Sequence, residues 1–495
     1  MGLSGRSEEN TSVMGGILLV LLAAAGAGAA TYEVGPDRPF QSIGEVPWAA
    51  LQPGDVVLIH WRPEPYREKW VLCRQGTAEE PIVVRGVASQ EGELPVIDGE
   101  GARTPAPLDF WNQERGVLKI GGASVPADTM PAHILIENLE IRGGRRPNTF
   151  TDHRGVTRSY ASNAAAIYVE KAAHLTIRNC VLHASGNGLF IGSVPGSPTR
   201  AVLVEGNYIY GNGNRGSLYE HNSYTEALEI VFQYNRYGPL AEGALGNNLK
   251  DRSAGLVVRY NWIEGGNRQL DLVDAGRELI YENPLYRETF VYGNILIEPA
   301  GAGNRQILHY GGDSGRTWQY RKGTLYFYNN TVVSTRTDRT TLMRLSTNDE
   351  HSDVRNNLVY ATAGGRSVSL LDVNGRLDWQ RNWIQPGWRV SFSRFEGLLY
   401  DRGDAVEADA PGFVDEESQD FHLTPDSTAL GKGVALADAA LPAHEVQRQY
   451  VRHLSSRERP EERRTDLGAL GLPVPAPDAP EETDVEPHGK AARRN

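Results

Sequence analysis

One short phrase recurs along the chain from about residue 133 and constrains the fold more than any other feature. A few β-forming residues lead to a polar residue or two and an asparagine, and a second short β-forming run follows, as in HLTIRNCVL at 174–182 and LVVRYNWI at 256–263. Nine asparagines mark these phrases: Asn138, Asn179, Asn207, Asn235, Asn261, Asn294, Asn330, Asn357 and Asn382. Their separations run from 25 to 41 residues, which indicates a minimal unit of about 25 residues with loop insertions.

Short alternating strands at this period, with no amphipathic helices between them, predict a parallel β-helix. Each coil lies about 4.8 Å above the previous one in such a solenoid. The chain has 54 glycines, and we expect them at corners where a positive φ is needed. The marker asparagines are expected to stack as a hydrogen-bonded ladder at one corner.

The repeat also settles how length and composition are interpreted. A chain of 495 residues would otherwise suggest several domains, whereas one solenoid accounts for most of it. Two cysteines are too few for a disulfide scaffold, and the net charge of −12 disfavours a nucleic-acid partner. Cys73 and Cys180 fall several coils apart, beyond the roughly 7 Å reach of a disulfide, so we expect two buried free thiols.

Three segments follow from composition along the chain: a leader at 1–30, the β-helix domain at 31–472 and a tail at 473–495. The apolar run at 17–30 is too short to span a bilayer and ends in an Ala-Gly-Ala cleavage site at 27–29. It predicts a signal peptide, a secreted or periplasmic protein and no stable membrane anchor. The tail is rich in proline and charge and is expected to be disordered.

The two ends of the predicted solenoid resemble a known family. The stretch YEVGPDRPFQSIGEVPWAALQPGDVVLIHW at 32–61 is similar to the N-terminal cap of the secreted right-handed parallel β-helix proteins of the pectate-lyase-like superfamily. FHLTPDSTALGKG at 421–433 and TDLGALG at 465–471 resemble their closing segments. The resemblance implies an all-β, single-stranded right-handed parallel β-helix with an N-terminal cap, acting on polysaccharides as a lyase, hydrolase, epimerase or non-catalytic binder. The Gly-His-Gly and Arg-Ile-Lys motifs of the polygalacturonate hydrolases are absent from the sequence, which disfavours that branch.

An internal alignment locates the candidate site. Residues 227–235 match residues 253–261 at a shift of 26, so the preceding segments HNSYTE (221–226) and NNLKDR (247–252) should stack as well. Together they make a polar patch about two coils tall. The next polar segment, NRQLDLVD at 267–274, follows closely.

β-Elimination of a uronate polysaccharide needs a neutralised carboxylate, a base for the C5 proton and an acid for the leaving oxygen. Four side chains of the patch could fill these roles and are the candidate catalytic residues: His221, Tyr224, Lys250 and Arg252. Four more could bind substrate: Asn222, Asn247, Asn248 and Arg268. Structural alternatives remain, because Glu226 over Arg252 could be an ion pair, Tyr224 over Lys250 a cation–π contact, and Asn222 with Asn248 a second ladder.

Calcium is the cofactor that the acidic residues suggest, with Glu226, Asp271 and Asp274 as candidate ligands; no organic cofactor is expected. The predicted function is an exported lyase that cleaves an acidic glycan by β-elimination, and the partner is a polysaccharide bound by a monomer. A glycoside hydrolase is the first alternative, with Asp271, Asp274 and Glu226 as its carboxylates. A uronate epimerase and a non-catalytic binding protein remain open as well.

Overall fold

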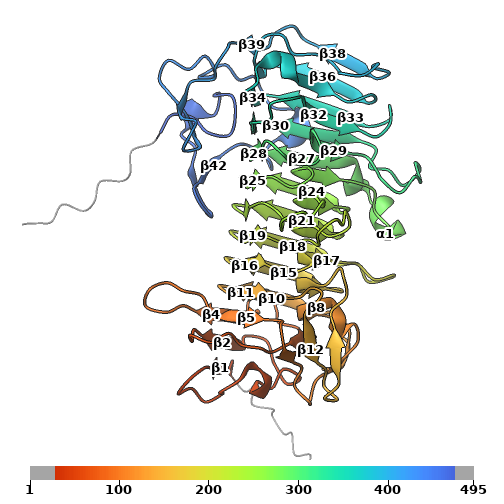
Figure 1. Cartoon of the computed structure of the whole chain (residues 1–495), viewed down its shortest axis with the longest axis vertical. Helices are drawn as coiled ribbons and strands as arrows, with labels where there is room; N and C mark the ends of the chain where they lie inside the picture. Colours follow the sequence, from red (N-terminus) through yellow and green to blue (C-terminus); the bar gives the residue numbers. More distant parts are fainter. Residues whose placement is uncertain (1–27, 474–495) are drawn as a thin grey trace, which may run out of the picture.

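The computed structural model describes residues 28–473, which wind into a parallel β-helix of stacked coils, as the repeat predicted (Figure 1). Three long parallel sheets run along its length. The first sheet has 13 strands: β1 (Thr31–Val34), β2 (Val56–His60), β4 (Ile82–Val87), β10 (Ala132–Glu137), β15 (Ala173–Arg178), β18 (Arg200–Glu205), β21 (Leu228–Gln233), β24 (Ala254–Arg259), β27 (Glu288–Tyr292), β30 (Thr324–Tyr328), β33 (His351–Arg355), β36 (Arg376–Gln380) and β38 (Leu398–Asp401).

The second and third sheets complete the three faces of each coil. The second has 11 strands: β5 (Val96–Asp98), β11 (Glu140–Arg142), β16 (Val181–His183), β19 (Tyr208–Tyr210), β22 (Arg236–Tyr237), β25 (Trp262–Glu264), β28 (Ile295–Glu298), β31 (Thr331–Ser334), β34 (Leu358–Ala361), β37 (Trp383–Ile384) and β39 (Val406–Glu407). The third has ten: β3 (Trp70–Leu72), β8 (Gly116–Ile120), β14 (Ala165–Val169), β17 (Asn187–Ile191), β20 (Ser223–Thr225), β23 (Leu249–Asp251), β26 (Leu270–Leu272), β29 (Gln306–Tyr310), β32 (Thr340–Leu345) and β35 (Val368–Leu371).

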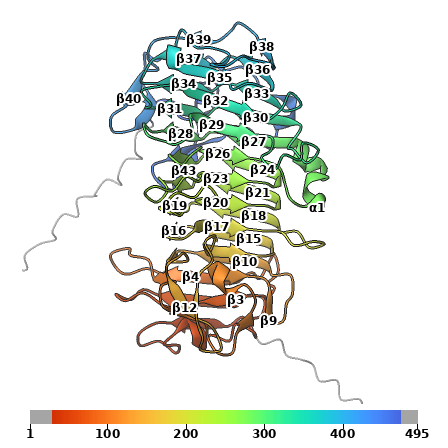
Figure 2. The ribbon, with the colours of Figure 1, turned by 45° about the vertical axis from the view of Figure 1, so that its right-hand side comes forward.

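Short elements decorate the coils. The remaining strands pair locally: β6 (Ala102–Arg103), β7 (Asp109–Phe110), β9 (Ala123–Val125), β12 (Thr149–Thr151), β13 (Thr157–Ser159), β40 (Phe413–Asp415), β41 (Asp420–Leu423), β42 (Arg448–Val451) and β43 (Ser455–Glu458). One α-helix, α1 (Glu278–Tyr281), stands beside the stack, and the 3₁₀ turns are Ile43–Glu45, Gln113–Arg115, Pro284–Arg287, Gly365–Ser367, Asp438–Ala440 and Glu461–Arg463. The rotated view in Figure 2 shows α1 projecting from the side of the β-helix.

Alternation along the strands fills the interior of the column. In β15, Leu175 and Ile177 are buried whereas His174 is exposed, and one apolar cluster continues from the first coils to the last. Because every second residue points inward, side chains of successive coils stack on one another in register. The 26-residue alignment is confirmed, since Val231 pairs with Val257 and Tyr224 with Lys250.

The predicted asparagine ladder lies at the corner between the first and second sheets. It runs through seven of the nine marker residues, from Asn207 to Asn382, and each backbone N–H and side-chain amide donates to Oδ1 of the next asparagine, as at Asn235 and Asn261 with distances of 3.0 and 2.9 Å. Asn138 and Asn179 are not part of it. They adopt positive φ one position earlier, and in the Asn179 coil it is Cys180 whose N–H donates to Asn207.

The segment after β39, residues 408–473, folds back over this ladder corner and is called here the C-terminal strap. Its backbone meets side chains of the middle coils: the Tyr328 hydroxyl donates to the His444 carbonyl at 2.6 Å, and the Asn356 amide donates to the Val434 carbonyl at 2.8 Å. Figure 1 shows β42 of the strap lying beside β25 and β28, far below the top of the column where β39 ends. The strap thus ties coils that are remote in sequence.

The remaining predictions about the ends and the thiols have different outcomes. Cys73 and Cys180 are buried and free, as expected, and burial raises the pKa of each thiol to about 12. The predicted leader falls almost entirely outside the described residues, and so does the predicted disordered tail. Within residues 28–473, no helix is long and apolar enough to cross a membrane.

Candidate functional site

A groove with a volume of about 740 Å³ lies over the outer face of the third sheet, around the predicted polar patch. Its lining combines cations, carboxylates, amides and aromatic rings: Leu218, Tyr219, His221, Tyr224, Asn247, Lys250, Arg252, Asn267, Arg268, Asp271, Asn304, His309, Gly312, Asp313, Gly315, Tyr320 and Arg344. Four of these side chains are Lys or Arg and two are Asp. The groove is therefore cationic in a chain whose net charge is −12.

Strand register explains why these side chains meet. Tyr224 pairs with Lys250, Lys250 with Asp271, Asp271 with His309, and His309 with Arg344 across β20, β23, β26, β29 and β32. Residues that are register partners in parallel strands project from the same face. The five side chains thus form one column down the groove, about one coil apart.

Lys250 is held between two carboxylates. Its ammonium nitrogen lies 2.6 Å from Asp271 and 2.5 Å from Asp313. Burial alone would lower the pKa of Lys250, but the two carboxylates outweigh it and raise the pKa above its ordinary value. In turn, Lys250 counters the burial of Asp271 and holds the pKa of that carboxyl well below its usual range. Lys250 is accordingly a fixed positive charge at neutral pH.

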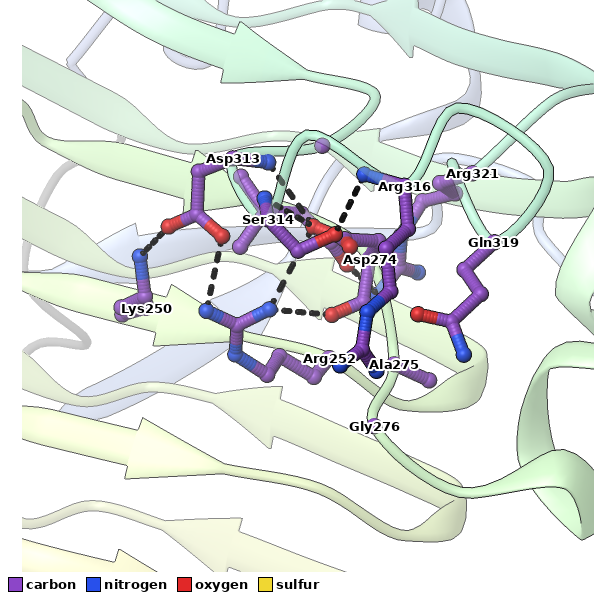
Figure 3. A network of polar contacts seen from close by, with 12 residues as sticks. Lys250, Arg252, Asp274, Ala275, Gly276, Asp313, Ser314, Arg316, Gln319 and Arg321 are labelled. Atoms are coloured by element: carbon purple, nitrogen blue, oxygen red, sulfur yellow. Dashed lines mark hydrogen bonds and ion pairs between the residues drawn. The ribbon is translucent and has the colours of Figure 1, made fainter.

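Arg252 connects this row of five side chains to the loop after β29 (Figure 3). Its guanidinium lies 2.8 Å from Asp313 and 3.4 Å from Asp274, and its Nε donates to the Tyr224 hydroxyl oxygen at 2.9 Å. Asp274 also accepts from the Asp313 backbone N–H at 2.8 Å, which fixes the loop after β29 against the end of β26. Arg252 therefore positions both an aromatic hydroxyl and a carboxylate at the groove floor.

His221 is neutral and its tautomer is set by the backbone. The Asn247 N–H donates to Nδ1 of His221 at 2.9 Å, so the ring hydrogen resides on Nε2. Burial, with Lys250 nearby, lowers the pKa of His221 to about 3. The ring meets Tyr224 edge-on at 5.4 Å between centroids. His221 can donate a hydrogen bond from Nε2, but neither nitrogen is free to act as a base.

The expected substrate-binding residues divide into two pairs. Arg268 and Asn247 line the groove; Asn247 donates to Asp271 at 2.8 Å, and Arg268 lies 3.9 Å from Asp271. Asn222 and Asn248 are fully buried and bonded to each other. They form the second ladder that the sequence left open, so the expectation that they contact substrate is corrected.

The expected calcium ligands do not form a cation site. Asp271 and Asp274 face Lys250 and Arg252, while Glu226 lines a neighbouring cavity, accepts from the Gly276 N–H at 3.1 Å and lies 3.9 Å from Arg277. Among residues 28–473, no group of three or more His, Cys, Asp and Glu side chains is arranged to hold a metal. Ca²⁺ needs several oxygen ligands around one point, whereas Asp271 and Asp274 face cations and Glu226 lies in a different cavity, so the residues present do not fit Ca²⁺.

Three residues of this region were missed from the sequence. Asp313 comes from the loop after β29, His309 is a strand residue among scattered histidines, and Ser346 follows β32. Insertions such as α1 lie between Lys250 and each of these three residues in the sequence, and they break the 26-residue period. The Glu226–Arg252 ion pair, which the sequence left open as an alternative, is absent among the described contacts, because Glu226 turns toward Arg277.

Comparisons with known proteins found one matching family model and several similar solved structures. Residues 134–332 match the family described as "Right handed beta helix region". Pectate lyase Pel9A is 13% identical with a TM-score of 0.48, covering 90% of this chain and 98% of its own. A rhamnogalacturonan lyase is 13% identical with a TM-score of 0.48, covering 83% and 97%. An alginate lyase from Paenibacillus sp. str. FPU-7 is 11% identical with a TM-score of 0.43, covering 72% and 93%.

No curated protein matches this chain. The match over residues 134–332 agrees with the sheet order and register described above. The predicted fold class is thereby confirmed. The chain is a parallel β-helix protein, and residues 134–332 match the family of right-handed β-helix regions.

Proposed function

We propose that the groove binds an acidic polysaccharide and cleaves it by β-elimination. The observation that carries the proposal is the cationic lining: Lys250, Arg252, Arg268 and Arg344 against Asp271 and Asp313. A groove of one charge sign attracts a polymer of the opposite sign even on a protein of the same net sign. Exposed Tyr219, at 79%, adds an aromatic surface of the kind on which sugar rings pack.

The cations have the first role in the reaction. Abstraction of the C5 proton places negative charge on the neighbouring carboxylate, and fixed positive charges stabilise that charge as it develops. Lys250 and Arg252 are held in place by Asp313, and Arg268 stands on the next coil. The raised pKa of Lys250 favours a role as a stabilising charge over a role as the base.

Tyr224 has the second role. Its hydroxyl is held by Arg252 and lies at the groove surface. We assign it a concerted transfer, in which its oxygen takes up the C5 proton while its own hydrogen passes to the departing glycosidic oxygen. His221 donates a hydrogen bond from Nε2–H to the substrate beside Tyr224. All atoms balance, since the proton leaves C5, the C4–O bond breaks and a C4–C5 double bond remains.

The hydrolase alternative is less well supported by the carboxylates. Acid catalysis of glycoside hydrolysis needs a carboxyl that holds its proton at working pH. The pKa values of Asp271 and Asp313 are lowered by their cations despite burial. Burial raises the pKa of Glu226, but Glu226 lines the neighbouring cavity.

The experiment is a panel of uronate polysaccharides incubated with the full chain, read by the ultraviolet absorbance of the unsaturated product. Parallel arms contain Ca²⁺ or a chelator. We expect absorbance on at least one glycan in both arms, and its loss in Tyr224→Phe, a variant that keeps the ring. Reducing ends without absorbance would instead establish hydrolysis, and retention of glycan without any product would establish a binding protein.

A further inference from the structure

Asp271 and His309, which line the groove, form a hydrogen-bonded chain with Ser346 behind them. Asp271 Oδ1 lies 2.9 Å from Nδ1 of His309, and Nε2 of His309 lies 2.9 Å from Oγ of Ser346. Asp271 is 2% and His309 3% exposed, while Ser346 is half-buried. The β-elimination described above uses neither His309 nor Ser346.

The protonation state of His309 follows from its partners. An ionised carboxylate only accepts hydrogen bonds, so the hydrogen lies on Nδ1 of His309 and faces Asp271. In a neutral ring Nε2 is then an acceptor, directed at the Ser346 hydroxyl. Burial lowers the pKa of His309 although Asp271 acts to raise it. The imidazole therefore holds one hydrogen on the carboxylate side and a free lone pair on the serine side.

The surroundings of Ser346 suit a nucleophilic hydroxyl. The Gly312 N–H donates to Oγ at 2.9 Å, which leaves the hydroxyl one further lone pair for attack. The hydroxyl hydrogen can point to His309 or to the Gly312 carbonyl at 3.0 Å. His309, Gly312 and Arg344 all line the groove, and Arg344 supplies a cation two residues from Ser346.

We propose that Ser346, His309 and Asp271 are a nucleophile–base–carboxylate triad that hydrolyses ester substituents, such as O-acetyl groups, on the glycan in the groove. The choice of a glycan ester rests on the proposed function, whereas the esterase chemistry rests on the triad alone. A serine, a histidine and an aspartate joined in this order are recognised by geometry and not by fold or sequence position.

The reaction balances without a further reagent. Oγ of Ser346 attacks the ester carbonyl carbon while its proton passes to Nε2 of His309. The ester C–O bond breaks, and the sugar hydroxyl leaves with that proton. Water, deprotonated by His309, then cleaves the acyl-serine, which releases the carboxylic acid and restores the hydroxyl. Asp271 is a positioning residue that keeps the hydrogen on Nδ1.

The test begins with a fluorophosphonate probe, which bonds covalently to an activated serine, and a map of the labelled peptide by mass spectrometry. We expect one label, on Ser346, of the folded full chain. Hydrolysis of p-nitrophenyl acetate and release of acetate from an O-acetylated uronate polysaccharide should fall at least about 100-fold in Ser346→Ala. Ser314→Ala, which alters an exposed serine in the loop after β29, should retain label and turnover.

Absence of label and of ester turnover in the wild-type chain, or a label that persists in Ser346→Ala, would overturn the triad. The wild-type measurement does not depend on how any variant folds. The two proposals fail separately. Labelling and ester turnover without unsaturated products would leave the triad standing and remove the lyase, whereas unsaturated products without labelling would do the reverse.

Discussion

Lys250 owes its charge to its two carboxylate neighbours. A lysine with a side chain only 9% exposed would ordinarily favour its neutral form, yet Asp271 and Asp313 reverse that preference. The reverse also holds, because Asp271 is 2% exposed and depends on the ammonium group for its own ionised state. Lys250 and Asp271 thus stabilise each other's charge, and removal of either leaves a buried charge without its closest partner.

Replacing Lys250 by Met should therefore cost both stability and activity. Asp271 would lose its closest cation, and breaking a buried ion pair on one side costs about 3 kcal/mol. We expect urea unfolding to show a loss of that order and the unsaturated product to disappear. The double variant Lys250→Met, Asp271→Asn, which also removes the unmatched carboxylate, should recover part of the stability but none of the turnover. Native stability of the single variant would contradict the assigned pairing.

Glu298 gives a separate test of buried charge, away from the groove. It is fully buried between Gln269 at 2.8 Å and Arg336 at 3.0 Å, and burial raises its pKa to about 7 despite these partners. Since the folded state then binds this proton more tightly than the unfolded state, the contribution of Glu298 to stability is highest below pH 4.5 and falls as pH rises to about 7.

The expected change in unfolding free energy from this group is about 3 kcal/mol between those limits. Urea unfolding of the wild type and of Glu298→Gln at pH 5 and pH 8 measures it. The glutamine variant should lose less stability between the two pH values than the wild type does. Equal losses would show that Glu298 is ionised throughout.

At the scale of elements, the asparagine of the recurring phrase has different structural roles in different coils. Asn261 is fully buried and bonded to asparagines above and below, whereas Asn179 is exposed and adopts a φ of 53°. Both occupy the asparagine of the recurring phrase. The structure shows that one residue of offset decides whether an asparagine joins the ladder or makes the turn beside it.

Asn261→Ala and Asn179→Gly test this distinction. The first change leaves the Asn235 N–H and the Phe232 carbonyl without their buried partner, and we expect a loss of about 2–3 kcal/mol of unfolding free energy. The second change suits a positive φ and should stay within about 0.5 kcal/mol of the wild type. Similar losses in both variants would mean that the two asparagines have the same role.

The sequence predicted elements best where coils lack insertions. The 26-residue shift placed Tyr224 over Lys250 correctly because β20 and β23 are separated by a minimal coil. Asp313 and Ser346 could not be placed, since loops of irregular length intervene and long-range contacts through such loops leave no periodic signal. The inward direction of Asn222 and Asn248 was open because a one-residue change in register reverses which face a side chain occupies.

For the whole molecule, charge is distributed unevenly. The chain is acidic overall, yet the groove has four cationic side chains against two carboxylates. The net charge of the chain therefore says little about the charge of the ligand. The local excess of cations in the groove determines which ligand charge is attracted. The two free thiols both lie inside the β-helix, away from solvent.

Binding of an anionic glycan should weaken as salt increases, because ions screen exposed charges beyond about 10 Å at 0.1 M. Arg344→Gln removes an exposed cation from the groove and should lower both the affinity for uronate oligomers and its salt dependence. Arg394→Gln, at a site where the side chain is 90% exposed, is the matched control and should change neither. Calorimetric titration at two salt concentrations measures both. A salt-independent affinity would point to an uncharged ligand.

The native protein should react with no thiol reagent until it unfolds. Burial raises the pKa of both thiols to about 12, so little thiolate forms at neutral pH and none is accessible. Titration with a chromogenic disulfide should detect two thiols in denaturant and none before. Immediate reaction of either cysteine in the native state would mean that its coil opens.

The C-terminal strap changes how the folding of one coil depends on the others. Stacked coils alone would behave as a one-dimensional array in which each repeat depends only on its neighbours. The strap joins Tyr260 to Gln447, 187 residues further along the chain, and Tyr328 to His444. During synthesis those coils must stand without the strap until its residues, 187 positions beyond Tyr260, have been made. Docking of the strap then adds long-range contacts to a row of nearest-neighbour contacts, so that the middle coils and the strap must unfold together.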